Sequence, residues 1–297
     1  MSETSMTIRE KSEYVQVRSV GELHLVWYRF KRNRLALAGL VALAAFIASA
    51  SLAPIISPYD PLKMNLENNL ALPSQDYFLG TDELGRDILS RIIHGAQISL
   101  IIGLVSVGVA FAIGVPSGAV AAYKGGWSDS LVMRLMDILL SFPPILLAIV
   151  VITALGPGLF NAMIAVGISL VPIYARLTRG MVLHFKEQEF VEAARMVGAS
   201  DIRILFRHIM PNCMAPIIVQ STLNIASAIL SAAALGFLGL GAQPPTPEWG
   251  AMLSKGRVYL RAAPHISTFP GIAIMLTVLA FNMVGDGLRD ALDPRMT

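Results

Sequence analysis

The sequence predicts an all-α membrane protein, folded as a polytopic bundle of six transmembrane helices. Of its 297 residues, 55% are hydrophobic and only 14% are charged, whereas a soluble domain carries about 25% charged residues. The mean hydropathy is +0.63, and several apolar runs exceed the length of about 18 residues that indicates a membrane helix. This composition excludes a disordered chain and argues against a water-soluble enzyme.

The six spans follow from run length, because about 20 mostly apolar residues are needed to cross about 30 Å of hydrocarbon. The first run resembles a signal peptide at Ala48-Ser49-Ala50, but 34 residues precede it. Its apolar core also exceeds the usual length of about 7–15 residues, which favours an uncleaved anchor. The predicted spans are residues 35–56, 98–123, 138–155, 159–175, 215–240 and 268–288.

The distribution of basic residues predicts the orientation of the chain. An even number of spans places both termini on one side of the membrane. Of the 23 Lys and Arg residues, 17 lie on that side and 6 on the other. Because positive charge is retained on the cytoplasmic side, both termini are predicted to be cytoplasmic. The same distribution argues against nucleic acid as a partner.

Cations alternate with aromatic rings just before the first span. This pattern is typical of an amphipathic segment that lies on anionic lipid headgroups, so membrane lipid is an expected partner. A plain topology signal is an equal alternative. The residues concerned are Trp27, Tyr28, Arg29, Phe30, Lys31, Arg32 and Arg34.

Few polar groups lie within the spans. No Lys, Arg, Asp or Glu occupies the centre of a span, which argues against a proton- or sodium-coupled transporter. Arg134 and Asp137 lie one helical turn apart and are expected to pair. Asn224 and Asn282 are expected to form interhelical hydrogen bonds or to face a pathway. The five His residues are scattered and Cys213 is the one cysteine, so neither a metal site nor an internal disulfide is expected.

Small residues recur at intervals of four in the second and fifth spans. Such spacing lets helix backbones approach closely where no hydrophobic effect drives their association. Close packing is therefore predicted at Ala110, Gly114, Gly118, Ala228, Ala232 and Gly236.

The connection at 176–214 is far longer than a helical hairpin needs, and its residues are patterned. A short helix is predicted over 187–197. Gly198 is expected to end it in the left-handed conformation that glycine adopts readily. The spacing of four apolar residues puts them on one face of this helix. They are Phe190, Val191, Ala194 and Val197.

A second amphipathic helix is predicted to follow, with Ser200 as its N-cap and Pro211 as its stop. The pair of helices could rest on the bilayer or dock a soluble partner, with the first helix in a groove. The apolar positions of the second helix are Ile202, Leu205, Phe206 and Ile209.

Three parts of this connection carry a resemblance to a known family. Glu192-Ala193-Ala194, then Gly198, then Ile209-Met210-Pro211 resembles the "EAA" loop of the permease subunits of ABC importers. Met210 stands where that motif usually has leucine, a change between apolar residues of similar volume.

Other motifs narrow the resemblance to the C-type permease subunit of the dipeptide/oligopeptide/nickel importers, over residues 26–297. The run GTDELGRD at 80–87 with Ser90-Arg91 is similar to a family segment ahead of the second span. Further matches are Asn33-Arg34-Leu35-Ala36, Leu238-Gly239-Leu240-Gly241, Pro244-Pro245, Pro247 and Trp249-Gly250.

The resemblance implies a type I ABC importer transmembrane domain in a prokaryotic cytoplasmic (inner) membrane. Its implied partners are a second homologous permease, two cytoplasmic ATPase subunits and an extracytoplasmic substrate-binding protein. The implied division is a cytoplasmic tail at 1–34, the first helix with an extracytoplasmic loop at 35–96, and the transporter domain at 97–297 with its coupling loop at 176–214.

The resemblance also implies which residues couple the permease to the ATPases. The chain lacks the G-x-x-x-x-G-K-[ST] phosphate loop, so ATP and Mg would be bound by the partner subunits and this chain would not be an enzyme. The implied coupling residues are Phe190, Val191, Glu192, Ala193, Ala194, Val197 and Gly198.

The leading cargo is a di- or oligopeptide, with nickel, glutathione or another small solute as the alternative. A secondary transporter without ATPases is less expected. Asp82, Glu83 and Asp87 beside Arg86 could form an acid–base or cation site. They are explained better by a helix capped by Thr81, because carboxylates in a first turn are favourable to the helix dipole.

Overall fold

The computed structural model describes residues 22–292, which are mostly helical, with no β-strand among them. The longer helices are α2 (Glu22–Arg32), α3 (Arg34–Ser51), α5 (Ile88–Lys124), α6 (Gly126–Leu140), α7 (Pro144–Leu155), α8 (Leu159–Lys186), α11 (Met210–Phe237) and α13 (His265–Leu292). The short ones are α4 (Ala53–Ile56), η2 (Leu66–Asn68), α9 (Glu189–Met196), α10 (Asp201–Arg203), the π-helical η3 (Ile204–Ile209), α12 (Trp249–Gly256) and η4 (Arg257–Tyr259).

Five stretches within these residues are long and apolar enough to cross a membrane: α3, α5, α8, the continuous helix Asp201–Phe237, and α13. A sixth is obtained when α6 and α7, which are bent by 94° at their junction, are counted as one broken span. The prediction of a polytopic six-span bundle is confirmed in that sense.

Several predicted boundaries are too short. The second span begins at Ile88 and not at residue 98, because Asp87 caps α5 by accepting a hydrogen bond from the Ser90 N–H at 2.8 Å. The fourth span continues to Lys186, beyond the predicted end at residue 175. The predicted spans end where polar residues begin, but both helices continue through these polar residues.

The third span is not one helix over 138–155. The chain breaks between α6 and α7 at Pro143-Pro144, because a proline disfavours helical backbone in the residue before it. Helix α6 then lies against α8, where Arg179 donates to both carboxylate oxygens of Asp129 at 2.6 and 2.7 Å.

The predicted pair of Arg134 and Asp137 is wrong. Asp137 pairs with Arg176 of α8 instead. The spacing on α6 allowed a local pair, but the packing of α6 along α8 brings a cation from a distant part of the chain to this carboxylate. The partner was therefore decided by tertiary structure.

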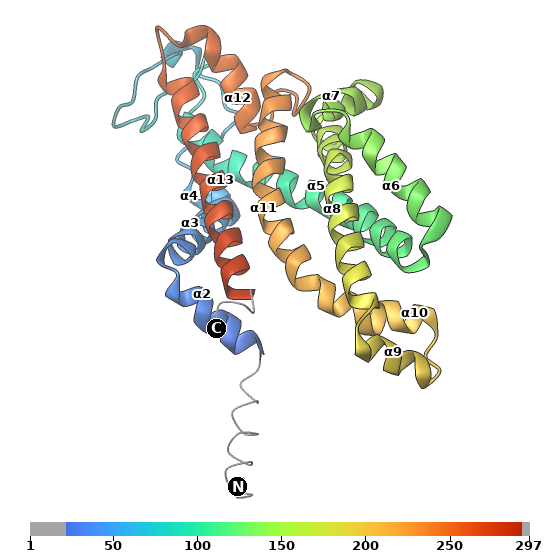
Figure 1. Cartoon of the computed structure of the whole chain (residues 1–297). Coiled ribbons are helices and arrows are strands. Elements are labelled where there is room, and N and C mark those ends of the chain that lie inside the picture. Colours follow the sequence, from blue (N-terminus) through green and yellow to red (C-terminus); the bar gives the residue numbers. More distant parts are fainter. Residues whose placement is uncertain (1–21, 293–297) are drawn as a thin grey trace, which may run out of the picture.

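Helices α5 and α8 form the centre of the bundle (Figure 1). Their contact depends on the predicted small residues, because a Cβ on Gly118 would collide with the carbonyl group of Ala175, and one on Gly114 would lie 2.6 Å from the Val171 carbonyl oxygen. Tyr174 of α8 donates to Ser221 of α11 at 3.0 Å. Within α11, the buried Asn224 accepts from Gln220 at 3.1 Å.

Helix α2 and the described end of α13 lie at the same end of the bundle as α9 and α10, while α12 lies at the opposite end (Figure 1). Phe30 holds α2 in place, since its ring is buried with Ala36, Val284 and Ala291. Trp27 and Tyr28 are exposed on α2.

The run at 80–87 is a folded loop at the α12 end, and Thr81 does not cap a helix as predicted. Its hydroxyl accepts from the Ala71 N–H at 2.8 Å and donates to the Asn68 carbonyl. The buried Arg86 donates to Asp82 at 2.7 Å. The acidic cluster is thus occupied in holding the loop together.

Candidate functional site: the segment between α8 and α11

The segment that joins α8 to α11 begins with α9, which spans Glu189–Met196 and is slightly shorter than the predicted 187–197. Two of the four predicted apolar residues anchor it, because Val191 is 0% exposed and Ala194 is 8% exposed in the main core. Phe190, the third, is 41% exposed and does not share the buried face as predicted, although its ring centroid lies 6.5 Å from that of Phe185.

The prediction that Val197 shares the packed face is wrong. This residue is 84% exposed, because the helix ends at Met196 and Val197 is its C-cap. Glu192 and Ala193 are also exposed. Helix α9 therefore has a narrow buried edge and an exposed surface that carries small, apolar, acidic and basic side chains, the basic one being Arg195.

Gly198 has a φ of +78°, the left-handed conformation predicted for it. Its N–H donates to the Arg195 carbonyl at 3.0 Å, and the Ala199 N–H donates to the Ala194 carbonyl at 3.1 Å. A Cβ at this position would meet nothing within 4 Å. Backbone conformation, and not lack of space, is the reason for glycine here.

Ser200 lies at the N-cap of the next helix as predicted, although its side chain makes no capping hydrogen bond. Pro211 does not stop that helix, which runs on without a break to Phe237. A proline cannot donate to the carbonyl four residues before it. The π-helical turn at Ile204–Ile209 immediately precedes it, and there the Met210 N–H donates to the Leu205 carbonyl, five residues back.

This wider turn changes which residues are buried. Leu205 and Ile209 are buried as predicted, but Ile202 and Phe206 are exposed and Ile204 is buried in their place. The predicted face assumed a regular helical period, and the π-helical turn shifts that period.

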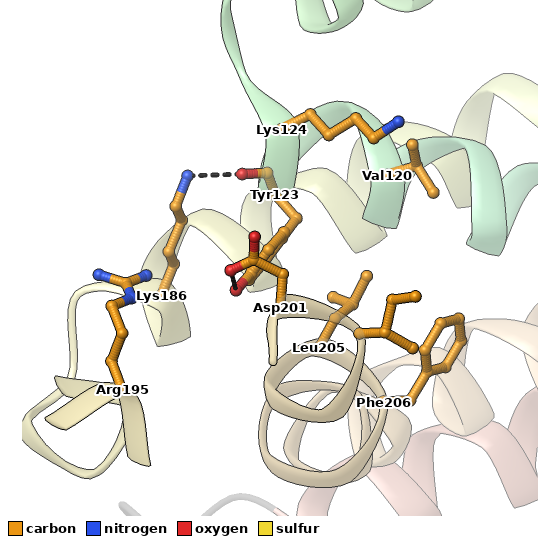
Figure 2. A pocket seen from close by; sticks show the side chains of 9 residues that line it. Val120, Tyr123, Lys124, Lys186, Arg195, Asp201, Leu205 and Phe206 are labelled. Carbon is orange, nitrogen blue, oxygen red and sulfur yellow. Dashed lines mark hydrogen bonds between the residues drawn. The ribbon is translucent and has the colours of Figure 1, made fainter. Parts of the chain in front are cut away.

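A hydrogen-bonded link ties this segment to α5, and sequence reasoning missed it. The Tyr123 hydroxyl donates to Asp201 Oδ1 at 2.7 Å, and Lys186 Nζ donates to the Tyr123 carbonyl at 2.7 Å (Figure 2). Lys186 Nζ also lies 5.4 Å from the centroid of the Tyr123 ring. Tyr123 and Asp201 are 78 residues apart, so no local pattern pointed to their contact.

Within residues 22–292, no group of three His, Cys, Asp or Glu side chains is placed to hold a metal ion. What the segment offers is a short helix with a free surface, fixed to the bundle through Val191, Ala194 and the link at Tyr123.

Comparison with known families decides the identity of the chain. The family described as binding-protein-dependent transport system inner membrane component matches residues 114–297. The chain belongs to this family. The N-terminal transmembrane domain of oligopeptide transport permease C matches residues 22–73. The chain is therefore an inner-membrane permease component of an ABC importer, and ATP hydrolysis in such importers lies in separate subunits, as expected.

Named relatives extend over nearly the whole chain. A dipeptide transport system permease protein, DppC, of Alkalihalophilus pseudofirmus is 51% identical over 90% of this chain and 88% of its own length. A di/tripeptide transport system permease protein, DppC, of Pseudomonas aeruginosa is 49% identical over 91% of each chain. A glutathione transport system permease protein, GsiD, of Escherichia coli is 50% identical over 92% of this chain and 90% of its own.

Among solved structures, an inward-facing MetNI methionine ABC transporter has a chain that matches with a TM-score of 0.57 and 20% identity. The match covers 69% of this chain and 98% of that one. It confirms the predicted fold of an ABC importer permease.

Proposed function

We propose that this chain forms half of the translocation pathway of an ATP-driven importer for di- and oligopeptides, beside a second, homologous permease. The observation that carries the proposal is the sequence identity of 51% and 49% to permeases named for dipeptides and di/tripeptides, over about nine-tenths of the chain. A binding protein delivers the peptide, and two ATPase subunits supply the energy.

Helix α9 is the proposed contact with the ATPases. Its free surface would enter a groove on an ATPase, while its buried edge keeps it on the bundle. Closure of the ATPases on ATP would then move α9 as a rigid body and switch the permease pair between inward- and outward-open states. The proposed coupling residues are Phe190, Val191, Glu192, Ala193, Ala194, Val197 and Gly198, of which Val191 and Ala194 anchor the helix and Gly198 sets its exit.

This proposal places α9, α2 and both termini on the cytoplasmic side. The excess of Lys and Arg supports that orientation. Helix α2 would lie on anionic headgroups, since Trp27 and Tyr28 are exposed and Lys31 Nζ lies 4.8 Å from the centroid of the Trp27 ring. The division at residues 34 and 96 belongs to the same proposal.

Glutathione is the second candidate cargo, because a relative of 50% identity is named for it. The test is reconstitution of this chain with its partner permease, both ATPases and the binding protein. ATP hydrolysis is then measured with a panel of di- to pentapeptides, glutathione and nickel. Stimulation by di- and tripeptides supports the proposal, and stimulation by glutathione or nickel alone contradicts the peptide assignment.

A further inference from the structure

A cavity of about 620 Å³ lies where the ends of α5 and α8 meet α9, α10 and η3. Its charged lining is unbalanced, because three cations, Lys124, Lys186 and Arg195, accompany a single carboxylate, Asp201. Within residues 22–292 none of the three cations forms an ion pair. Asp201 already accepts from the Tyr123 hydroxyl, and Lys186 donates to the Tyr123 backbone carbonyl, which carries no net charge. The cavity therefore attracts an anion that the described chain does not supply.

The remaining wall of the cavity is apolar and consists of Val120, Ile202, Leu205 and Phe206. Figure 2 shows Val120, Leu205 and Phe206 on the side of Lys124, and Lys186 and Arg195 across the Tyr123–Asp201 pair. Phe206 is 62% exposed. A small inorganic anion would use the cations and leave this wall in water, whereas an anionic amphiphile would use both.

The position of the cavity along the helix axis matches that of lipid headgroups. Lys124 ends the membrane-spanning α5, and Trp127, at the start of α6, is 78% exposed. Tryptophan is enriched at the level where hydrocarbon gives way to headgroups. Basic pockets between transmembrane helices at this level bind acidic headgroups.

We propose that this cavity binds one anionic phospholipid of the cytoplasmic leaflet. Its phosphate is held by Lys124, and an acyl chain lies along Val120 and Phe206 on the same side of the Tyr123–Asp201 pair. Lys186, across that pair and bonded to the Tyr123 carbonyl, contributes through its charge and not by direct contact. The proposal rests on the orientation proposed above. Because the cavity is built from both the end of α5 and the segment after α9, the bound lipid contributes to the position of the coupling helix.

The test measures lipid binding and not transport, so its result is independent of the cargo. The complete transporter is purified in mild detergent, and phosphatidylglycerol and phosphatidylcholine retained on it are quantified by native mass spectrometry. The double variant Lys124→Gln/Lys186→Gln should bind phosphatidylglycerol about 30-fold more weakly, since each basic residue near the surface contributes about 1 kcal/mol. Lys124→Arg/Lys186→Arg should retain it.

A matched loss of charge at the opposite end, Lys63→Gln/Arg261→Gln, should leave the retained lipid unchanged. Equal retention by the Gln pair and the wild type, or equal binding of phosphatidylcholine, overturns the proposal. So does competition by inorganic phosphate, which would indicate a site for a soluble anion.

A photoreactive benzoylphenylalanine at Phe206 tests the occupant directly in membranes. A crosslink to phospholipid supports the proposal. A crosslink to an ATPase or to the second permease assigns the cavity to a protein contact and overturns it.

Discussion

Two glycines of this chain are required for different physical reasons. Gly118 faces the backbone of α8, and a side chain there would collide with Ala175. Gly198 has open space around it but a φ of +78°, which costs other L-residues about 1–2 kcal/mol. Substitutions at the two positions should therefore fail in different ways.

Replacing Gly118 with alanine should destabilise the bundle. The added Cβ forces α5 and α8 apart, and such overpacking costs about 1–3 kcal/mol. Thermal unfolding of the detergent-solubilised protein measures the loss. Gly108→Ala in the same helix meets nothing within 4 Å and should not lower the melting temperature. Equal effects of the two substitutions would contradict close packing at Gly118.

Replacing Gly198 with valine should spare the bundle and impair coupling. The strained turn after α9 would rearrange, so the ATPases should dissociate during purification while the unfolding temperature of the permease changes little. The ratio of ATPase to permease after size-exclusion chromatography is the measurement. Gly180→Ala, also in open space, serves as the control. A normal ratio in the valine variant would count against α9 as the docking element.

The stability of the fold should depend on pH through Glu248, which lies beside α12 at the end of the bundle opposite α9. Its buried carboxylate caps α12 by accepting from the Gly250 and Ala251 N–H groups, both at 2.7 Å. Burial raises the pKa of Glu248, and the two hydrogen bonds oppose that shift in part.

An acid with a raised folded-state pKa stabilises the fold most when it is protonated. This contribution is complete below the unfolded pKa of about 4.3 and is lost as the pH rises through the folded-state value. Melting temperatures measured from acid to neutral pH should show that decline in the wild type. Glu248→Gln should flatten it, and the exposed Glu67→Gln should not. An unchanged profile in Glu248→Gln would refute the assignment.

At the scale of elements, α9 is a short helix with few anchors. Val191 and Ala194 hold it to the core, and the Tyr123–Asp201 hydrogen bond holds the following helix to the end of α5. Movement of α9 by an ATPase would therefore reach α5 over a short path. The Tyr123–Asp201 hydrogen bond is therefore a specific contact through which transmission of movement from α9 to α5 can be tested.

Tyr123→Phe and Asp201→Ala should each loosen the segment at 189–209. The double variant should lose about as much opening free energy as one single variant, because both substitutions remove the same hydrogen bond. A single hydrogen bond contributes about 0.5–1.5 kcal/mol, so the coupling energy of the double-mutant cycle should be of that size. Amide hydrogen exchange in the segment provides the free energies. Strict additivity of the two substitutions would show that the pair does not interact.

The elements that sequence reasoning predicted are those set by local rules. Helix α9 and its glycine exit follow from period and backbone preference, and both are present. The bend between α6 and α7 also has a local signal in Pro143-Pro144, but its angle depends on packing against α8. The pairing of Asp137 with Arg176 depends on a residue distant in sequence, so no window of the chain revealed it.

At the scale of the whole molecule, the bundle has two distinct ends. One carries α2, α9 and α10, and the other carries α12 and the loop at 80–87 (Figure 1). Composition predicted the membrane class and the spans, and the charge distribution predicted which end faces the cytoplasm. The cargo is a property of the assembled importer, which explains why no residue pattern in this chain identified it.

The central claim is that separate nucleotide-consuming subunits drive this bundle through α9. Ala193 is exposed on α9, and the one native cysteine, Cys213, is buried, so Ala193→Cys introduces a single accessible thiol. The most direct test is to label that thiol with maleimide-benzophenone and to irradiate the reconstituted importer, because the benzophenone inserts into a C–H bond of whatever protein α9 contacts and needs no second thiol. The account predicts an adduct with the ATPase and loss of ATP-driven peptide uptake on its formation. Uptake that continues at full rate with α9 crosslinked, or that proceeds without ATP, would contradict it.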